Sequence, residues 1–192
     1  KGGLWYDTRP TTLDYSIRDL EVDCTGSERS IGFINCTNLT NCTGTGSGPY
    51  GYNGYGFRDC TNLTNCTGTG TGTYGYGFLS CTNLTNCTGT GSGTYGGNGY
   101  GFYNCTNLTN CTGTGTGTGT GSYGYGFSYC TNLTNCTGTG TGASGYGFYN
   151  ITTASNCKNG GSGTMWGGTN KNINVETCRK TLVNADNATL NT

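Results

Sequence analysis

The chain has 192 residues, of which 39 are Gly, and its nine basic and nine acidic side chains give a formal net charge of zero. This balance argues against a nucleic-acid-binding protein, because neutralising phosphates requires a basic stripe. The chain also lacks a run of about 18 apolar residues, so we expect no membrane span.

The first 31 residues differ in composition from the rest. Residues 20–26 resemble a degenerate copy of the repeat described below, and we predict an N-terminal cap with a degenerate first coil over residues 1–31. The acidic side chains here could cluster on that coil, and a solvated polar cap is the simpler interpretation; they are Asp14, Asp19, Glu21, Asp23 and Glu28.

Five copies of one unit follow, Gly-Phe-x-x-Cys-Thr-Asn-Leu-Thr-Asn-Cys-Thr-Gly-Thr-Gly. The copies start at Phe33, Phe57, Phe78, Phe102 and Phe127. Regular recurrence at this period indicates a solenoid, and fixed offsets argue against the disorder that high Gly content otherwise suggests. We predict an all-β protein, a single parallel β-solenoid (β-helix) of about seven coils with 21 to 25 residues per coil. Residues 32–157 form the repeat region, and residues 158–192 form a last coil and C-terminal cap or the lead-in to a further domain.

Identical positions of successive coils should stack about 4.8 Å apart as ladders. The apolar positions predict the core: Phe33, Phe57, Phe78, Phe102 and Phe127; Leu39, Leu63, Leu84, Leu108 and Leu133; and two Cys columns, Cys36, Cys60, Cys81, Cys105 and Cys130 with Cys42, Cys66, Cys87, Cys111 and Cys136. Ile151 stands where a further Cys of the first column is expected, and Cys157 continues the second.

These apolar positions recur every three residues, which fits neither a strand nor a helix. Bends between short strands would reset which side faces inward. Asn suits such bends because it tolerates left-handed backbone conformations, so we place bends at the columns that begin with Asn38 and Asn41. The expected strands lie near Gly-Phe-x-x-Cys, near Leu-Thr-Asn-Cys and through Thr-Gly-Thr-Gly.

The Thr-Gly segments alternate with a period of two, so all Thr side chains lie on one face and all Gly on the other. If Thr points outward, the result is a flat array of hydroxyl and methyl groups; if Gly points outward, a bare backbone face is exposed. The candidate Thr face comprises Thr43, Thr45, Thr67, Thr69, Thr71, Thr88, Thr90, Thr112, Thr114, Thr116, Thr137, Thr139 and Thr141.

The paired cysteines leave three interpretations open. They could form one disulfide per coil, or two ladders of buried thiols that act as small apolar residues. A metal site is the weakest interpretation, because zinc sites favour Cys spacings of two to four residues. We predict no metal and no cofactor.

An enzyme is not expected. Between residues 33 and 157 the only charged side chains are Arg58 and Asp59, and the chain has no His. A carboxylate pair for glycoside hydrolysis and a base for a Ser or Cys nucleophile are therefore missing from the repeat. The Asn-Leu-Thr and Asn-Cys-Thr tripeptides match N-glycosylation acceptors, but stacked Asn ladders are the preferred interpretation.

Tyrosines crowd the variable segment that follows each Thr-Gly run. In this setting Tyr suits recognition surfaces and sugar stacking, or it simply seals the corner of each coil. The candidate recognition corner comprises Tyr50, Tyr52, Tyr55, Tyr74, Tyr76, Tyr95, Tyr100, Tyr123, Tyr125 and Tyr146.

The repeat unit resembles the coils of right-handed parallel β-helix proteins, and it is similar to repeats of bacteriophage tail fibres and bacterial surface adhesins. This resemblance implies an extracellular or virion-surface fibre or adhesin module that binds a surface receptor or glycan and can form a homo-oligomer or fibre. The Thr array also resembles that of β-solenoid ice-binding proteins, which implies ice as the alternative partner. Insertions directly after the Thr run count against ice binding unless they lie off the face.

Overall fold

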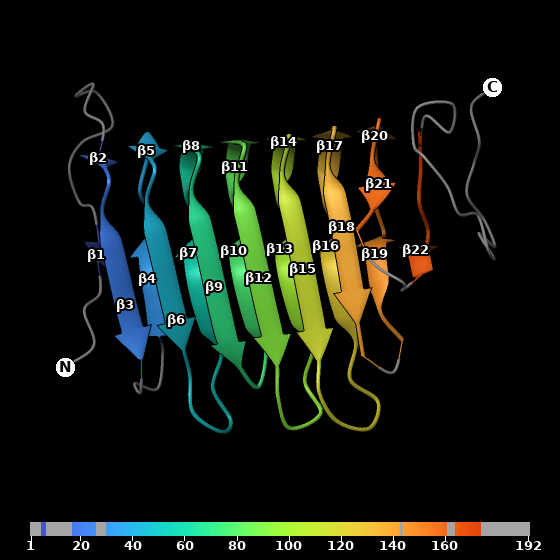
Figure 1. Ribbon diagram of the computed structural model, residues 1–192, viewed down its shortest axis with the longest axis horizontal. Coiled ribbons are helices and arrows are strands. Elements are labelled where there is room, and N and C mark those ends of the chain that lie inside the picture. Colours follow the sequence, from blue (N-terminus) through green and yellow to red (C-terminus); the bar gives the residue numbers. More distant parts are fainter. Residues whose placement is uncertain (1–4, 7–16, 26–29, 143, 161–163, 174–192) are drawn as a thin grey trace.

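The computed structural model describes residues 5–6, 17–25, 30–142, 144–160 and 164–173. In these ranges all strands belong to three parallel sheets, and the predicted β-solenoid is confirmed. None of the described segments is a helix long and apolar enough to cross a membrane. We call the three sheets A, B and C, and their strands are given below. In Figure 1 sheet C faces the viewer, sheet A lies behind it, sheet B runs along the top, and the connecting loops lie at the lower edge.

Each coil contributes one strand to each sheet. Sheet A contains β1 (Trp5–Tyr6), β4 (Ser30–Ile34), β7 (Gly54–Arg58), β10 (Gly75–Leu79), β13 (Gly99–Tyr103), β16 (Gly124–Ser128), β19 (Tyr146–Tyr149) and β22 (Thr164–Gly167). Sheet B contains β2 (Ile17–Arg18), β5 (Leu39–Thr40), β8 (Thr61–Thr64), β11 (Thr82–Thr85), β14 (Thr106–Thr109), β17 (Thr131–Thr134) and β20 (Ala154–Ser155). Sheet C contains β3 (Glu21–Thr25), β6 (Thr43–Ser47), β9 (Thr67–Gly72), β12 (Thr88–Gly93), β15 (Thr112–Gly117), β18 (Thr137–Thr141) and β21 (Lys158–Asn159).

Left-handed residues produce the three-residue period. The predicted bends are confirmed, because Asn38 and Asn41 have φ of 57° and 53°, and the equivalent Asn residues of later coils share this conformation. A third left-handed position, just before the first Cys of each coil, was not predicted. Its residue type varies, from Asn35 and Asp59 to Ser80 and Tyr129, so composition gave no signal. In the repeat units, a left-handed residue directly before the first Cys ends the strand of sheet A, and one directly before the second Cys ends the strand of sheet B. The strands therefore stop earlier than the sequence indicated.

The core is built from the predicted ladders. The Phe, Leu and two Cys columns are almost fully buried and form one continuous cluster. Successive Phe rings stack in parallel with centroids 4.7 to 5.2 Å apart, and the column ends at Trp166, 4.8 Å from Phe148. Ile151 and Cys157 are buried in the last described coil, as the sequence predicted.

Beyond the Phe ladder, the interior between sheets A and C is made of backbone. The Gly residues of sheet C are buried and its Thr residues are not, so Thr points outward. A Cβ atom on Gly77 or Gly101 would lie 2.6 Å from the backbone nitrogen of Thr90 or Thr114. Only Gly allows two sheets to approach this closely.

At the N-terminal end, the described residues continue the stack of coils. β2 and β3 pair in register with β5 and β6. Asp14, Glu28, Cys178 and most of the two predicted caps lie outside the described residues.

Candidate functional site

The Thr face is the outer surface of sheet C, and its side chains form three columns in strict register. The first column is Thr43, Thr67, Thr88, Thr112 and Thr137; the second is Thr45, Thr69, Thr90, Thr114 and Thr139; the third is Ser47, Thr71, Ser92, Thr116 and Thr141. The strands lie about 4.8 Å apart, and alternate residues along a strand are about 6.7 Å apart. The result is a two-dimensional array that spans five coils.

Most hydroxyls of this face are free to bond water. Within the described chain, the hydroxyls of the first and second columns have no protein hydrogen-bond partner. The third column differs, since the Thr71 hydroxyl bonds to that of Ser47 at 2.8 Å and the Thr141 hydroxyl to that of Thr116 at 3.2 Å. In two of the three columns, therefore, no described protein group competes with water for the Thr hydroxyls.

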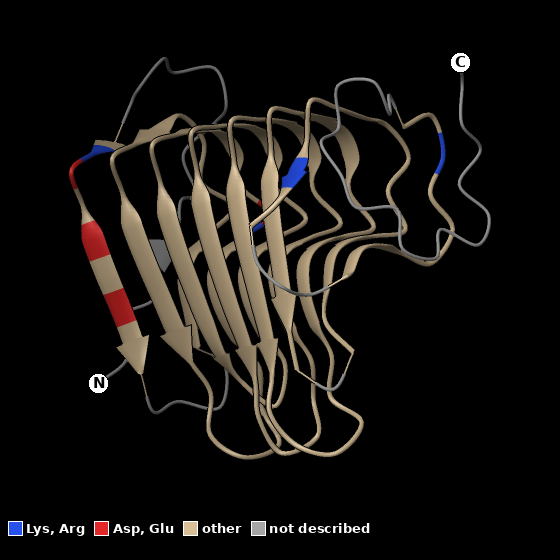
Figure 2. Cartoon of the chain, turned by 45° about the vertical axis from the view of Figure 1, so that its right-hand side comes forward, with Lys and Arg blue, Asp and Glu red and all other residues tan. Residues whose placement is uncertain are grey.

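Neither charges nor insertions interrupt the Thr face. Figure 2 shows uncharged strands between an acidic strand at one end and a basic residue at the other. These charges are Glu21 and Asp23 on β3 and Lys158 on β21. The insertions that vary coil length form loops at the lower edge (Figure 1), and the register of sheet C is unchanged across coils of different length. The objection raised by these insertions is therefore removed.

These charges lie on β21 and β3, the two edge strands of sheet C in the described residues, which are the strands that could pair with another sheet. Charged side chains on edge strands disfavour edge-to-edge pairing. The acidic group predicted on the first coil is thus divided: Glu21 and Asp23 lie in β3, whereas Asp19 accepts a hydrogen bond from Asn41 Nδ2 at 3.0 Å.

Asn side chains form ladders along sheet B. In the Asn38 column each Nδ2 donates to the Oδ1 of the preceding coil: Asn62 to Asn38, Asn83 to Asn62, Asn107 to Asn83 and Asn132 to Asn107, at 2.9 to 3.0 Å. In the Asn41 column, Asn65 donates to Asn41 at 3.2 Å. These amides are used in structure, as the sequence interpretation preferred.

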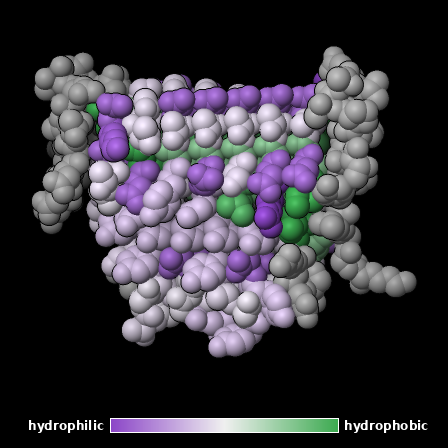
Figure 3. Space-filling view, turned by 180° about the vertical axis from the view of Figure 1, so that it is seen from behind, coloured by the Kyte–Doolittle hydropathy of each residue, from purple (hydrophilic) through white to green (hydrophobic). Residues whose placement is uncertain are grey.

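The predicted Tyr corner consists of two groups, which meet where the Tyr123 ring stacks on the Tyr125 ring at 5.9 Å. Tyr55, Tyr76, Tyr100, Tyr125 and Tyr146 lie on the outer face of sheet A, where their rings stack 5.0 to 6.0 Å apart. We call this column the Tyr ladder. Its ring faces cover one another and leave little area for a sugar. Figure 3 shows this side of the molecule, with rows of like side chains running along the solenoid.

The second group lies in the loops: Tyr50, Tyr52, Tyr74, Tyr95 and Tyr123, which we call the loop tyrosines. Tyr50 and Tyr95 are 73% and 70% exposed and meet edge to face at 4.8 Å, although they come from coils two apart. Tyr95 holds this position with a φ of 57°, an unusual conformation for an aromatic residue.

Three Tyr residues outside the predicted corner extend the aromatic surface. Tyr103, Tyr129 and Tyr149 contact the Tyr ladder or one another. The sequence analysis missed them because they occupy the two variable positions between Phe and Cys, where other coils carry Arg58, Leu79 or Asn.

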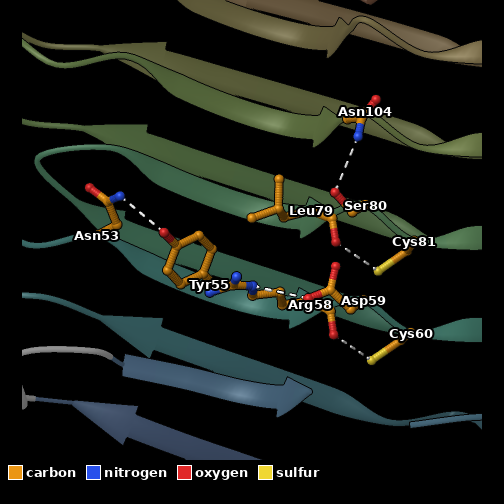
Figure 4. Close-up of polar contacts among 9 residues, drawn as sticks. All are labelled: Asn53, Tyr55, Arg58, Asp59, Cys60, Leu79, Ser80, Cys81 and Asn104. Carbon is orange, nitrogen blue, oxygen red and sulfur yellow. Dashed lines mark hydrogen bonds and ion pairs between the residues drawn. The ribbon is translucent and has the colours of Figure 1, made fainter. Parts of the chain in front are cut away.

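The cysteines of the described coils are buried and form no disulfides with one another, which agrees with the thiol-ladder interpretation. Each ladder thiol bonds to the carbonyl two residues earlier, as for Cys60 to Arg58 at 3.2 Å and Cys81 to Leu79 at 3.4 Å (Figure 4). Burial raises the pKa of the Cys42 thiol and that of Cys81, which favours the protonated form. Among the described residues, no group of three or more potential metal-binding side chains could hold an ion.

The one charged pair of the repeat is structural in character. Arg58 Nε lies 3.1 Å from Asp59 Oδ2, and the guanidinium lies 5.5 Å from the centroid of the Tyr55 ring. Figure 4 shows the pair on the surface of β7, beside the Asn53 amide that donates to the Tyr55 hydroxyl at 3.0 Å.

Comparison with protein-family models, with curated proteins and with solved structures found no match to this chain.

Proposed function

We propose that the protein binds ice through the Thr face. The observation that carries this proposal is the strict register of three Thr and Ser columns over five successive strands of sheet C. A surface that orders water into a lattice must repeat hydroxyl and methyl groups at fixed intervals in two directions, and these columns do so.

Rigidity supports the same proposal. The second column lies directly over the Gly residues of sheet A, for which a Cβ would come within 2.6 Å of the backbone nitrogens of Thr69, Thr90, Thr114 and Thr139. Backbone packed this closely cannot bend inward. The adjacent Phe ladder keeps the coil spacing between 4.7 and 5.2 Å from β4 to β19.

The composition of the face is also suitable. It is uncharged between Glu21 and Asp23 at one end and Lys158 at the other, and a charged side chain would hold a hydration shell of its own. The free hydroxyls of the first two columns can instead join a water lattice.

Thermal hysteresis and ice-crystal shape test the proposal. We expect faceted crystals and a freezing gap for the natural protein, and loss of both when Thr69, Thr90 and Thr114 are changed to Tyr. The matched control changes Thr64, Thr85 and Thr109 to Tyr, because these residues belong to the same three coils but lie on sheet B. Equal activity of the two triple variants, or disc-shaped crystals with the natural protein, would contradict ice binding on this face.

The exposed pair Tyr50 and Tyr95 favours a second candidate, a fibre or adhesin module at an extracellular or virion surface that binds a receptor or glycan. Edge-to-face aromatic rings at adjacent loop tips offer free ring faces to a partner. This candidate expects self-association in analytical ultracentrifugation and glycan-array binding that falls when both residues are changed to Ser. A monomer without array binding would count against it.

A further inference from the structure

One coil departs from the repeat at two adjacent positions on the outer face of sheet A. In the column after each Phe, bulky residues stand in the neighbouring coils, and Ser128 lies between Tyr103 and Tyr149 in register. At the next position Tyr129 replaces the Asn found at positions 104 and 150, and it has a φ of 54°. The fold requires neither change, since the coils on both sides use Tyr followed by Asn.

The Ser128 hydroxyl is left without a partner. Its side chain is 1% exposed, and within the described chain its Oγ is the one buried side-chain oxygen or nitrogen that makes no hydrogen bond. It lies on the outer side of the sheet, because Phe127 before it enters the core and its register partners Tyr103 and Tyr149 contact the Tyr ladder. A buried hydroxyl without a hydrogen-bond partner destabilises the fold.

The ring of Tyr129, the next residue, contacts the rings of both register partners of Ser128. Its centroid lies 5.6 Å from that of Tyr103 and 6.1 Å from that of Tyr149, so it stands between the two residues that flank Ser128. Tyr129 is 50% exposed, and rotation of its side chain toward solvent would open a space bounded by two Tyr rings with a hydroxyl at its base. We call these four residues the Ser128 site.

We propose that the Ser128 site binds one neutral pyranose ring of a carbohydrate. Aromatic walls receive the apolar faces of a sugar, and the Ser128 hydroxyl can bond to a sugar hydroxyl. A neutral ligand is favoured because β13, β16 and β19 supply no charged side chain. Among the described strands of sheet A, Arg58 is the one charged residue, and it belongs to β7, three strands away from β16, roughly 14 Å. The site is on the opposite side of the solenoid from the Thr face, so this inference does not depend on ice binding.

Amide NMR titration with methyl hexopyranosides of glucose, galactose and mannose tests the proposal. A single small sugar is expected to bind with Kd of about 1 mM or weaker. Shifts should centre on residues 103, 128–129 and 149 for at least one sugar. The proposal would be overturned if none of the three sugars shifted these residues. It would also be overturned if tetramethylammonium chloride, added in place of a sugar, shifted them.

Variants separate the site from the general aromatic surface. Ser128→Ala should weaken binding by about 2- to 10-fold, the value of one neutral hydrogen bond. The double change Ser128→Tyr with Tyr129→Asn restores the Tyr-Asn pair of the neighbouring coils, so it should fold normally and lose binding. Its matched control, Leu79→Tyr with Ser80→Asn, makes the same pair in β10 and should bind as the natural protein does. Equal binding by both double variants, each with an unchanged melting temperature, would refute the Ser128 site.

Discussion

Replacing Gly101 by Ala tests how closely sheets A and C are packed. A Cβ atom on this residue of β13 would lie 2.6 Å from the Gly126 carbonyl oxygen, 2.6 Å from the Thr114 nitrogen and 2.8 Å from the Gly113 Cα. All three are backbone atoms, so no side chain can rotate away. Ordinary contact begins near 3.4 Å, and the two sheets would have to separate by most of an ångström.

The expected cost can be assigned from general measurements. Overpacking lowers the free energy of unfolding by about 1 to 3 kcal/mol and occasionally more. Replacing Gly by Ala also reduces the entropy of the unfolded chain, which raises the free energy of unfolding by about 0.4 to 1 kcal/mol. Because backbone on both sides resists, we expect the free energy of unfolding to fall by about 2 kcal/mol. For a chain of this size, that lowers the melting temperature by roughly 4 to 8 °C.

Urea unfolding followed by circular dichroism measures this change. The control is Thr114→Ala, which alters the outer side of the opposing strand at the same place and should cost less than about 1 kcal/mol. If Gly101→Ala is as stable as the natural protein, the sheets do not touch through their backbones and the argument for a rigid Thr face fails.

Three further predictions concern the ladders. Asn83→Leu should cost about 2 kcal/mol in thermal unfolding, because a branched residue is strained at φ of 58° and two amide bonds are lost; Asn83→Gly should cost less, and equal costs would contradict the strain. Burial raises the pKa of Cys42, Cys81 and Tyr76 in the folded protein. The folded state therefore holds these protons more tightly than the unfolded state does. Their contribution to stability is complete below the ordinary thiol pKa of about 8.5 and is lost as the pH rises through the higher folded-state pKa values. Melting temperatures should therefore fall in alkaline solution, and constant values from pH 8 to 11 would be inconsistent with these shifts. Iodoacetamide should label the ladder cysteines only after unfolding, and a reductant should leave the melting temperature unchanged; a drop on reduction would indicate disulfides within coils.

Sequence periodicity was sufficient to predict the solenoid, its core columns and the bends at Asn38 and Asn41. The reason is physical: in a stacked fold, every constraint on one coil is repeated in the next, so fold-determining residues recur visibly. The orientation of the Thr-Gly strand was not predictable, because alternation assigns two faces without saying which is inward. It is decided by Gly56, Gly77 and Gly101 on the opposing sheet, which accept only Gly across from them.

Residues that break the repeat were harder to interpret. Tyr129 lies at a left-handed position that Asn, Asp or Ser fills in the other coils, and Ser128 lies where bulky side chains are usual. Each departure occurs in a single coil and so does not contribute to the periodic pattern. Its significance could be recognised only from burial and hydrogen bonding. The separation of the Tyr ladder from the loop tyrosines was missed for a related reason, since one corner of the sequence unit spans both a sheet and a loop.

The backbone-filled interior has a thermal consequence. The heat capacity of unfolding rises with the apolar area that becomes exposed and falls with the polar area. Between sheets A and C the buried surface is largely peptide backbone, so the heat capacity per residue should lie below the usual value of about 12 to 15 cal/mol/K. A smaller heat capacity flattens the curve of stability against temperature, and the loss of hydrophobic stabilisation on cooling matters less. A solenoid of this kind should therefore stay folded in supercooled water, where proteins with large aliphatic cores approach cold denaturation.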